Sequence, residues 1–361
     1  MQSLDEQSTP ALFQAARSRH LEAEEALAEI RRHKGVIPVA LTQDDRIVWR
    51  DIGDCPLHEW KFRFSIRNLV ETSGPGLCFT TDMDILRCDD TELGPGQPPA
   101  GFIFHMSKCG STLMARILDQ SPHHIVLKEP TPLHERFWRY LSDDWNAPIE
   151  ASEANLRMIR NMVQLMGRTR LPEQRSYFVR FRSWMIAFVA LIQRAFPDTP
   201  CLFMYRDPVE VMASILSKPT TGLPRLKESG AAAFITGQTQ SALLAMDSLQ
   251  YFTAFYQSYL QYSLTEMKDP THYLNYRDLT REHLPHIHKT AFGFMPSDRT
   301  LSNMLGQFDV YSKDDTGRTQ FSSDRQEKQR LVSPAMREAA ERHLMRYYDA
   351  LERHDRNLYH G

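Results

Sequence analysis

The feature that most constrains the fold of this chain is the run FIFHMSKCGSTLMARIL at 102–118. Its apolar beginning predicts a buried strand, Phe102–Met106, and a short turn of small and polar residues follows. From Ser111 the apolar residues recur at helical spacing. The first amides of a helix are unpaired, and the helix dipole favours negative charge beside them. The run therefore predicts an anion-binding turn, to which Lys108 adds a cation and Thr112 a hydroxyl donor.

The order of residues in this turn differs from that of the common nucleoside-triphosphate loop. That loop reads G-x-x-x-x-G-K-[ST], whereas here Lys108 precedes Gly110, and Phe104 and His105 stand where the first glycine belongs. A kinase also needs carboxylates for Mg²⁺, and the acidic residue at a comparable strand end, Asp207, is better explained as a helix cap. A kinase or other phosphotransferase remains an alternative, as does a strand–turn–helix without a ligand.

A second run, CLFMYRDPVEVMASIL at 201–216, also reads as strand, turn and helix. Asp207 is expected to be the N-cap, and Glu210 to close a capping box. Arg206 would lie at the carboxyl end of the strand, where ligands bind in open α/β sheets. Ser214 follows two helical turns later, so Arg206 and Ser214 can both reach a second anion. The alternative is that Arg206 pairs with a carboxylate and Ser214 only packs.

The alternation of strands and helices after residue 98 predicts an α/β fold. We expect a three-layer parallel sheet flanked by helices over 99–361, after a Gly- and Pro-rich linker, and an accessory α+β segment over 1–98. The predicted strands of the sheet are Phe102–Met106, Ile125–Lys128, Tyr177–Phe181, Cys201–Tyr205 and Thr271–Tyr276. The predicted helices are Ser111–Asp119, Glu153–Arg168, Trp184–Ala195, Pro208–Ser217, Ser241–Glu266 and Pro334–Arg353.

Two further segments have recognisable patterns. In the accessory segment, Leu12–Arg32 is helical in pattern, and Val36–Leu41 and Arg46–Trp49 are short strand-like runs. The stretch 217–240 is rich in Gly, Pro and Thr, which predicts a mobile loop over a site.

Composition limits the class of protein. The 361 residues include 43 Lys plus Arg against 45 Asp plus Glu, a formal net charge of −2, which argues against nucleic acid as the main partner. The apolar runs are too short for a membrane span, and the polar N-terminal residues do not resemble a signal peptide. Five scattered cysteines show no metal-ligand spacing. We therefore expect a cytoplasmic protein without a bound metal, and the sequence carries no signal for an oligomeric state.

The two anion-binding runs resemble motifs of the sulfotransferases. SKCGST at 107–112 is similar to their 5′-phosphosulfate loop, whose pattern is close to K-S-G-T-T-W. YRDPVEVMASIL at 205–216 is similar to their 3′-phosphate motif, an Arg and a Ser eight residues apart. The order and separation of the two motifs also match, and the resemblance covers about residues 100–330. It implies the sulfotransferase variant of the P-loop fold and the donor 3′-phosphoadenosine 5′-phosphosulfate (PAPS), which leaves as adenosine 3′,5′-bisphosphate.

The resemblance also implies roles for the residues of the first run. Lys108 would contact the bridge of the 5′-phosphosulfate. Ser111 and Thr112, with the loop residues Cys109 and Gly110, would hold the 5′-phosphate.

Further roles follow for residues later in the chain. Arg206 and Ser214 would hold the 3′-phosphate, and Tyr276 resembles the tyrosine beside adenine, although a structural tyrosine is equally consistent. The stretch 317–330 resembles a late basic loop that closes on the 3′-phosphate, with Lys328 as a candidate ligand beside Arg325 and Arg318. The alternative for that stretch is a solvated helix start.

Two positions depart from the family pattern. Leu113 stands where many members have a tryptophan that stacks on adenine, and Cys109 replaces a common Ser or Gly. The first departure removes the aromatic ring that stacks on adenine in those members, whereas neither departure removes an anion donor.

Sulfuryl transfer to a hydroxyl or amine needs a base that takes the acceptor's proton. Glu129, 21 residues after Lys108 and at a predicted strand end, is our first candidate, because glycosaminoglycan sulfotransferases use a glutamate from a similar place. Lys128 would assist or orient the sulfate. An ion pair of Glu129 with Arg180 or Arg182 is the alternative. The fallback bases are His123, His124 and His134.

The acceptor itself is expected to be a small molecule, a carbohydrate or a peptide. A non-catalytic nucleotide-binding protein with the same fold is the third interpretation of the whole chain.

Overall fold

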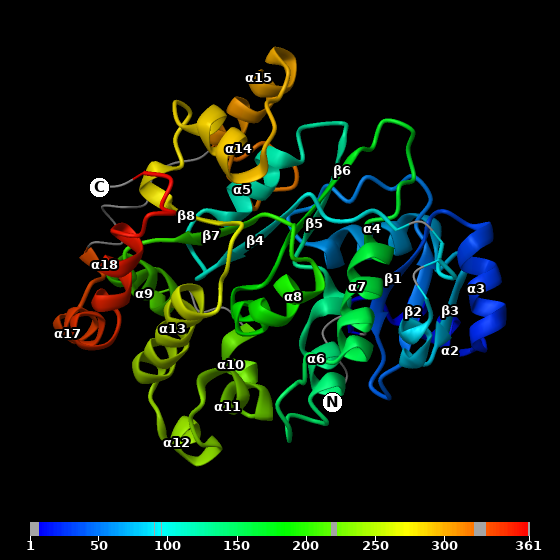
Figure 1. Cartoon of the computed structure of the whole chain (residues 1–361), viewed down its shortest axis with the longest axis horizontal. Helices are drawn as coiled ribbons and strands as arrows, with labels where there is room; N and C mark the ends of the chain where they lie inside the picture. The colour runs from blue at the N-terminus through cyan, green and yellow to red at the C-terminus, as the bar shows by residue number, and fades with distance from the viewer. Residues whose placement is uncertain (1–6, 90, 95, 218–221, 321–329, 360–361) are drawn as a thin grey trace. The chain divides into compact units, whose positions relative to one another are not determined.

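The computed structural model describes residues 7–89, 91–94, 96–217, 222–320 and 330–359 (Figure 1). The chain forms two compact units. The first contains the residues up to 101 together with 118–180 and 194–196, and the second contains 102–117, 181–193 and the residues from 197 onward. Segments on both sides of residue 98 contribute to the first unit, and the domain boundary expected there stays a prediction.

The strands form two sheets, one of three strands and one of five. The strands are β1 (Val36–Leu41), β2 (Ile47–Asp51), β3 (Cys78–Thr81), β4 (Gly101–His105), β5 (His124–Lys128), β6 (Ser176–Arg180), β7 (Cys201–Tyr205) and β8 (Thr271–Asn275). The smaller sheet has the order β1-β2-β3 and is antiparallel. The larger has the order β5-β6-β4-β7-β8, with parallel pairing of β5 with β6, β4 with β7 and β7 with β8. The predicted α/β fold with a parallel sheet is confirmed, and the five strands lie where the sequence predicts them.

Helices of the first unit pack against the strands of the smaller sheet (Figure 1). The helices of this unit are α2 (Pro10–Arg17), α3 (Ala23–Arg32), α4 (Phe62–Ser73), α6 (Glu135–Leu141), α7 (Glu153–Met166) and the 3₁₀ turns η1 (Met83–Arg87) and η2 (Thr131–Leu133). The helical pattern of Leu12–Arg32 corresponds to two helices, because the chain between α2 and α3 pairs with β3. The Leu21 amide donates to Thr80 O, and the Thr80 amide donates to Arg19 O.

The helices of the second unit include those that follow the strands of the two motifs. They are α5 (Ser111–Leu118), η3 (Ser183–Phe188), α8 (Val189–Ala195, which ends in the first unit), α9 (Pro208–Ser217), α10 (Gly222–Leu226), α11 (Gly230–Thr236), α12 (Gln240–Ala245), α13 (Ser248–Thr265), η4 (Tyr276–Asp278), α14 (Leu284–Phe292), α15 (Asp298–Gly306), η5 (Gln307–Asp309), α17 (Pro334–His343) and α18 (Met345–Glu352).

Two long helices predicted for this unit are each divided into two. The helix expected over Ser241–Glu266 is interrupted because Asp247 forms a capping box with Gln250 and starts α13 anew. The helix expected over Pro334–Arg353 is interrupted at Leu344, between α17 and α18. The helical content is as predicted, but the continuity is not.

The prediction of a loop over 217–240 is wrong for the residues that the structure describes. They include α10 and α11, and Ala231, Ala232 and Ile235 of α11 are fully buried. Phe234 stacks on Phe188 of η3, with ring centroids 6.0 Å apart. Small and apolar residues therefore make this stretch a packed helical layer, and its first residues, 218–221, lie outside the description.

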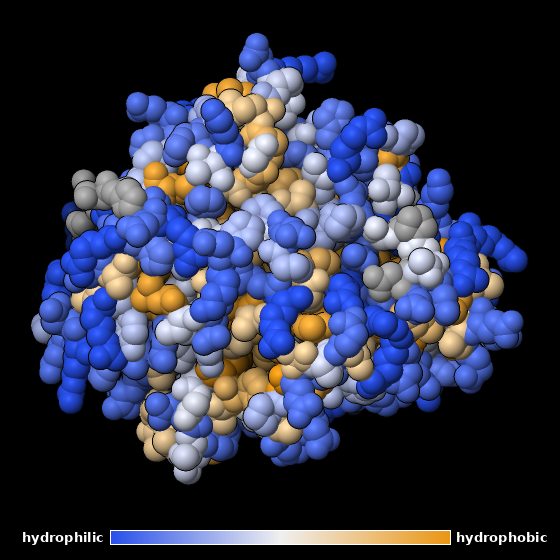
Figure 2. Space-filling model, viewed as in Figure 1, coloured by the Kyte–Doolittle hydropathy of each residue, from blue (hydrophilic) through white to orange (hydrophobic). Residues whose placement is uncertain are grey.

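The face of the molecule drawn in Figure 2 is mostly hydrophilic, with apolar residues interspersed. The large apolar side chains that the described residues expose include Leu244, Met295, Tyr311 and Leu331. Within the described part of the chain, we find no helix with the length and apolar character that crossing a bilayer requires.

Candidate functional site

The turn between β4 and α5 has an unusual backbone. Its φ angles are +77° at Ser107, +51° at Lys108 and +79° at Gly110, all in the left-handed region. A non-glycine residue in that region costs about 1–3 kcal/mol and persists only where its surroundings hold it. Successive N–H groups in turns of this kind line concavities that bind anions. The backbone therefore fits the anion-binding role that the sequence predicts, and we call residues 106–112 the cradle.

Contacts from two neighbouring strand ends hold the cradle in this conformation. The Ser107 amide donates to His105 Nδ1 (3.0 Å), and His105 Nε2 lies 2.9 Å from Phe181 O. Because an amide only donates and a carbonyl only accepts, Nδ1 is the acceptor and Nε2 carries the hydrogen. On the other flank, the buried Cys109 thiol donates to Met204 O of β7 at 3.1 Å. His105 and Cys109 thus give the turn a support that can offset its strain.

Arg206 joins the second motif to the cradle. Its Nη1 donates to Lys108 O at 3.3 Å, and its guanidinium lies 4.7 Å from the centre of the Tyr276 ring. Its Nε and Nη2 bind Glu210 Oε2 at 2.7 and 2.5 Å, and the side chain is only 8% exposed. The structure therefore brings Lys108, Arg206 and Tyr276 together. It also contains an ion pair between Arg206 and a carboxylate, the alternative that the sequence left open for this residue.

The start of α9 is formed as the sequence predicts. Asp207 Oδ1 accepts hydrogen bonds from the amides of Val209 (2.8 Å) and Glu210 (3.1 Å), which caps the helix. The cap fixes the exit of the chain from β7, so Arg206 leaves the strand in a defined direction.

Gly110 lies directly against Tyr276. A Cβ atom at position 110 would collide with Cδ2 of that ring and lie 2.7 Å from its Cε2, and Leu279 Cδ2 would be 3.4 Å away. Only glycine fits here, both for its φ of +79° and for this close approach. Tyr276 is thus part of the cradle's wall, which is a structural role, while contact with adenine stays a prediction.

The hydroxyl groups of both motifs are largely buried. The exposed fraction is 4% for Ser111, 8% for Thr112 and 5% for Ser214. The first two begin α5, where helix amides and the dipole favour an anion, and Ser214 lies in the second turn of α9. Their positions match the predicted elements, and their contacts with phosphate stay predictions.

The residues just before the late basic stretch, 312–315, are hydrogen-bonded to α5. Arg116 Nε donates to Ser312 O at 3.1 Å, and its Nη2 binds Asp314 O and Asp315 Oδ1 at 2.8 and 3.0 Å. Arg318 is exposed in the turn that follows, and its amide donates to Asp314 Oδ2. Lys328 and Arg325 lie outside the described residues.

In the first unit, Glu129 is clamped between two cations. Arg180 Nη2 lies 3.0 Å from Oε1 and Lys61 Nζ lies 3.1 Å from Oε2, and the carboxylate side chain is 12% exposed. The Glu129 amide donates to Arg180 O at 2.8 Å, with φ of +56° at Glu129. The ion pair with Arg180 that the sequence left open is therefore present, and the role as a base stays a prediction.

Lys128 has a different environment from the one expected for a sulfate-orienting residue. Its ammonium is fully buried and donates to Asp119 Oδ2 (2.7 Å) and Leu57 O (3.0 Å). His58 Nδ1 lies 3.0 Å from the same Asp119 oxygen. Burial would raise the pKa of Asp119, but Lys128 and His58 outweigh that effect and the pKa is lowered. Lys128 is therefore neutralised by a charged carboxylate inside the first unit.

Two of the three fallback histidines donate hydrogen bonds to the main chain. Nδ1 of His123 lies 2.9 Å from Glu173 O, and Nδ1 of His124 lies 2.7 Å from Leu118 O, so both nitrogens donate. Burial lowers the pKa of His124. His134 is the N-cap residue of α6. The contacts of His123 and His124 are sufficient to explain these two as structural groups, whereas a role of His134 as a base stays a prediction.

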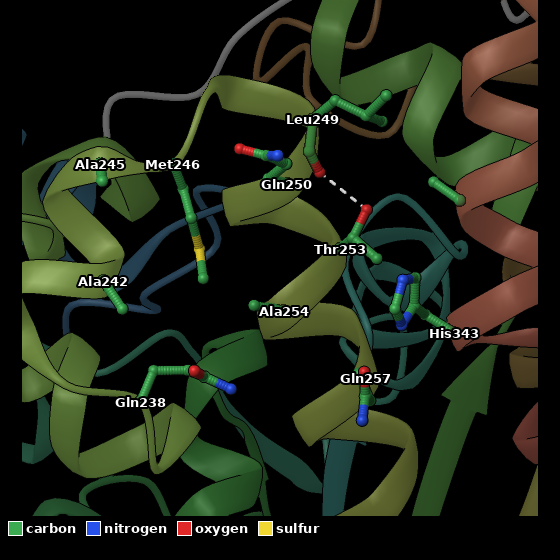
Figure 3. Close-up of a pocket in the computed structure, with 11 residues that line it drawn as sticks. Gln238, Ala242, Ala245, Met246, Leu249, Gln250, Thr253, Ala254, Gln257 and His343 are labelled. Carbon is green, nitrogen blue, oxygen red and sulfur yellow. Dashed lines mark hydrogen bonds between the residues drawn. The ribbon is translucent and has the colours of Figure 1, made fainter.

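A pocket of about 520 Å³ opens in the second unit, between α12, α13 and α17 (Figure 3). Met246 and His343 face it, and the Thr253 hydroxyl donates to Leu249 O at 2.7 Å within α13 (Figure 3). Asp, Glu, Lys and Arg are absent from the described residues that line it. None of the predicted cofactor residues belongs to that lining either, so this pocket is separate from the cradle.

Three residues that contribute to these two sites were not predicted from the sequence. His105 directly precedes the turn, and a histidine at the end of a buried strand was the available signal. Glu210 was assigned only to a cap, although its spacing of four from Arg206 also permits an ion pair. Lys61 is 68 positions before Glu129, and no local pattern connects the two.

Comparisons with known proteins identify the family of the chain. A protein-family model described as "Sulfotransferase family" matches residues 99–289, which is more than half of the chain. A search of curated proteins found no match.

Three similar solved structures are all sulfotransferases. The sulfotransferase domain from the curacin biosynthetic pathway is 12% identical, with 68% of this chain and 98% of that chain covered and a TM-score of 0.40. A sulfotransferase from Alicyclobacillus acidocaldarius is 16% identical, with 71% and 95% covered and a TM-score of 0.36. Sulfotransferase STF9 from Mycobacterium avium is 12% identical, with 81% and 84% covered and a TM-score of 0.36.

Proposed function

This chain belongs to the sulfotransferase family, which implies a PAPS-dependent enzyme, and we propose that it moves a sulfuryl group to an acceptor hydroxyl or amine. The observation that carries the proposal is the cradle, joined to Arg206 and Tyr276 within one unit. Its strained turn, buried hydroxyls and glycine-only approach suit a phosphorylated ligand. When bound, PAPS supplies the activated sulfuryl group. The acceptor class is a small molecule, a carbohydrate or a peptide.

The residues of the cradle fit the 5′ end of such a donor. The amides of Cys109 and Gly110 and the hydroxyls of Ser111 and Thr112 would hold the 5′-phosphate at the start of α5. Lys108 would neutralise charge on the bridging oxygen, which is the atom that gains charge during transfer. This role uses the lysine ammonium itself, so no metal is needed.

Arg206 and Ser214 would hold the 3′-phosphate. Arg206 is already oriented by Lys108 O and by the Tyr276 ring, so its guanidinium is ordered before a ligand arrives. It now binds Glu210, and the proposed phosphate would compete with that carboxylate. Tyr276 would contact adenine, and Lys328 would approach the 3′-phosphate from the late loop.

Glu129 is the proposed general base. Its two oxygens each contact one cation, which fixes the orientation of the carboxylate. A carboxylate has about four acceptor positions, so these two pairs are compatible with accepting a proton from an acceptor hydroxyl. Glu129→Gln should lower kcat by roughly 10²–10⁴-fold, the usual contribution of a general base, while leaving the affinity for adenosine 3′,5′-bisphosphate nearly unchanged.

The proposal is tested by calorimetry with adenosine 3′,5′-bisphosphate and with ATP–Mg²⁺, and by release of the bisphosphate from PAPS. Turnover is measured with a panel of simple phenols, alcohols and amino sugars, and with water alone. We expect bisphosphate binding and a loss of turnover of roughly 10²–10³-fold in Lys108→Met. Lys289→Met, which changes an exposed lysine of α14, is the matched control and should behave as the wild type.

Two results would contradict the proposal. Tighter binding of ATP–Mg²⁺ than of the bisphosphate would indicate a phosphotransferase. Binding of the bisphosphate without any turnover of PAPS would indicate a non-catalytic protein.

We also propose a cytoplasmic location. The five cysteines form no disulfide with one another, and Cys109 donates its thiol hydrogen to Met204 O, which a reducing compartment would preserve.

A further inference from the structure

We propose that residues 57–61 of the N-terminal segment hold the proposed base in place, with Lys61 as a positioning residue for Glu129. This inference rests on the proposed function, since it assigns a partner to the proposed base. Nothing in the sequence motifs or in the family match, which begins at residue 99, includes this segment.

The segment is attached to the ends of β5 and β6 at three points. Lys128 Nζ donates to Leu57 O at 3.0 Å, and Arg180 Nη2 lies 3.4 Å from Trp60 O. The third point is the ion pair of Lys61 with Glu129, at 3.1 Å. Lys128 and Arg180 are the last residues of two parallel strands and Glu129 follows β5 directly, so all three lie at the carboxyl ends of strands, where ligands bind in sheets of this class.

The conformation of the segment is itself supported locally. Leu57 has φ of +56° and is 3% exposed. Glu59 accepts hydrogen bonds from Ser65 Oγ and Asn68 Nδ2, at 2.5 and 2.8 Å, which attaches the segment to α4. Because Trp60 and Lys61 follow directly, their position is set by contacts on both sides.

Lys61 is held in place as well as paired. Its ammonium lies 4.5 Å from the centre of the Trp60 ring and its side chain is 17% exposed. A lysine confined between an aromatic face and a carboxylate has lost most of its rotamer freedom before any substrate binds. The structure thus contains a preorganised contact at Oε2 of Glu129.

The arrangement assigns different tasks to the two cations. Arg180 is a β6 residue that is 2% exposed in its side chain, and it fixes Oε1 from within the sheet. Lys61 fixes Oε2 from the accessory segment. With only one of these contacts the carboxylate can rotate about its terminal torsion, which is broad and soft. Misplacing a catalytic group by about 1 Å can cost on the order of 10²-fold in rate.

The test compares Lys61→Met, Lys61→Arg and the control Lys34→Met, an exposed lysine of the same unit. Turnover is bisphosphate release from PAPS with the best acceptor of the panel, or with water alone. We expect Lys61→Met to lower kcat by roughly 10–100-fold, with the KM for PAPS and the Kd for the bisphosphate unchanged. Lys61→Arg should recover most of the rate, and Lys34→Met should equal the wild type.

A double-variant cycle distinguishes positioning from general stability. If Lys61 acts through Glu129, then Lys61→Met should add little to the loss already caused by Glu129→Gln. An unchanged kcat in Lys61→Met, or losses that simply multiply in the double variant, would overturn the inference. Wild-type protein that fails to bind the bisphosphate would instead overturn the proposed function, so the two failures are separate. Thermal denaturation of each variant confirms that comparisons are made on folded protein.

Discussion

Replacing Gly110 by alanine tests the geometry of the cradle. The φ of +79° costs a residue with a Cβ about 1–2 kcal/mol. The added methyl group would also collide with the Tyr276 ring, with Cε2 only 2.7 Å away, well inside the 3.5–4.0 Å of normal carbon contact. Overpacking of this kind costs roughly 1–3 kcal/mol. We therefore expect Gly110→Ala to reduce the free energy of unfolding by about 2–5 kcal/mol, the sum of the two costs.

The same substitution should weaken ligand binding, because Tyr276 also packs on the Arg206 guanidinium at 4.7 Å. A displaced ring moves the residue proposed to hold the 3′-phosphate, so the Kd for adenosine 3′,5′-bisphosphate should rise at least tenfold, about 1.4 kcal/mol. The assays are urea unfolding and calorimetry.

Gly293→Ala is the matched control for this substitution. Its φ is +72°, but no atom lies within 4 Å of the added Cβ. Gly293→Ala should therefore lower the free energy of unfolding only by the cost of the positive φ, about 1–2 kcal/mol, and leave the Kd for the bisphosphate unchanged. Equal destabilisation by the two substitutions, with an unchanged Kd in Gly110→Ala, would refute the reasoning.

Two further predictions concern charged groups. Glu210→Gln removes the carboxylate that occupies Arg206, so the Kd for the bisphosphate should fall by roughly three- to tenfold in calorimetry; a higher Kd would mean that Glu210 mainly orients Arg206. Folding lowers the pKa of Asp119, so its ionisation stabilises the fold at pH values above about 3.8, the usual pKa of an aspartate. That stability is lost as the pH falls through the lower pKa of the folded state. Urea unfolding from pH 6 to pH 2 should show this loss of stability in the wild type, and Asp119→Asn should lack the part of the loss that Asp119 causes. At pH 7 this variant should be less stable by about 3–5 kcal/mol, because Lys128 is then buried without its counter-charge. An acid dependence in Asp119→Asn equal to that of the wild type would contradict this role of Asp119.

The sheet and the helix starts were predictable because their signals are local. β7 and α9 have the predicted bounds, since the buried run Cys201–Tyr205 ends at an Asp-Pro pair that both caps and begins a helix. The break between α12 and α13 also had a signal, the Asp247 and Gln250 of a capping box, but continuing apolar periodicity concealed it. Apolar periodicity indicates which face of a helix is buried, but it does not indicate whether one helix continues or a second helix begins.

The contacts of the site were less predictable because most join distant residues. The left-handed φ of Ser107 and Lys108 depends on His105 and on Cys109 binding Met204 O, which is 95 positions away. The burial of Lys128 depends on Asp119 and on Leu57. The motif therefore predicts what the cradle binds, whereas tertiary contacts decide how the cradle is held.

The burial of the ion pairs at the two sites indicates which cations can exchange their carboxylate for an anionic ligand and which cannot. Lys128 and Asp119 have side-chain exposures of 0% and 6%, so breaking this pair would leave an uncompensated buried charge. Arg206 and Glu210 are 8% and 16% exposed, and an anion that replaces Glu210 at Arg206 supplies the same charge, so the exchange is nearly balanced. Glu210 can then turn toward solvent from the first turn of α9, where its charge is favoured by the helix dipole. For the same reason, Glu129 keeps its ion pairs with both cations in our proposal. The acceptor brings a proton and no charge that would compete for Lys61 or Arg180, so neither ion pair has to break.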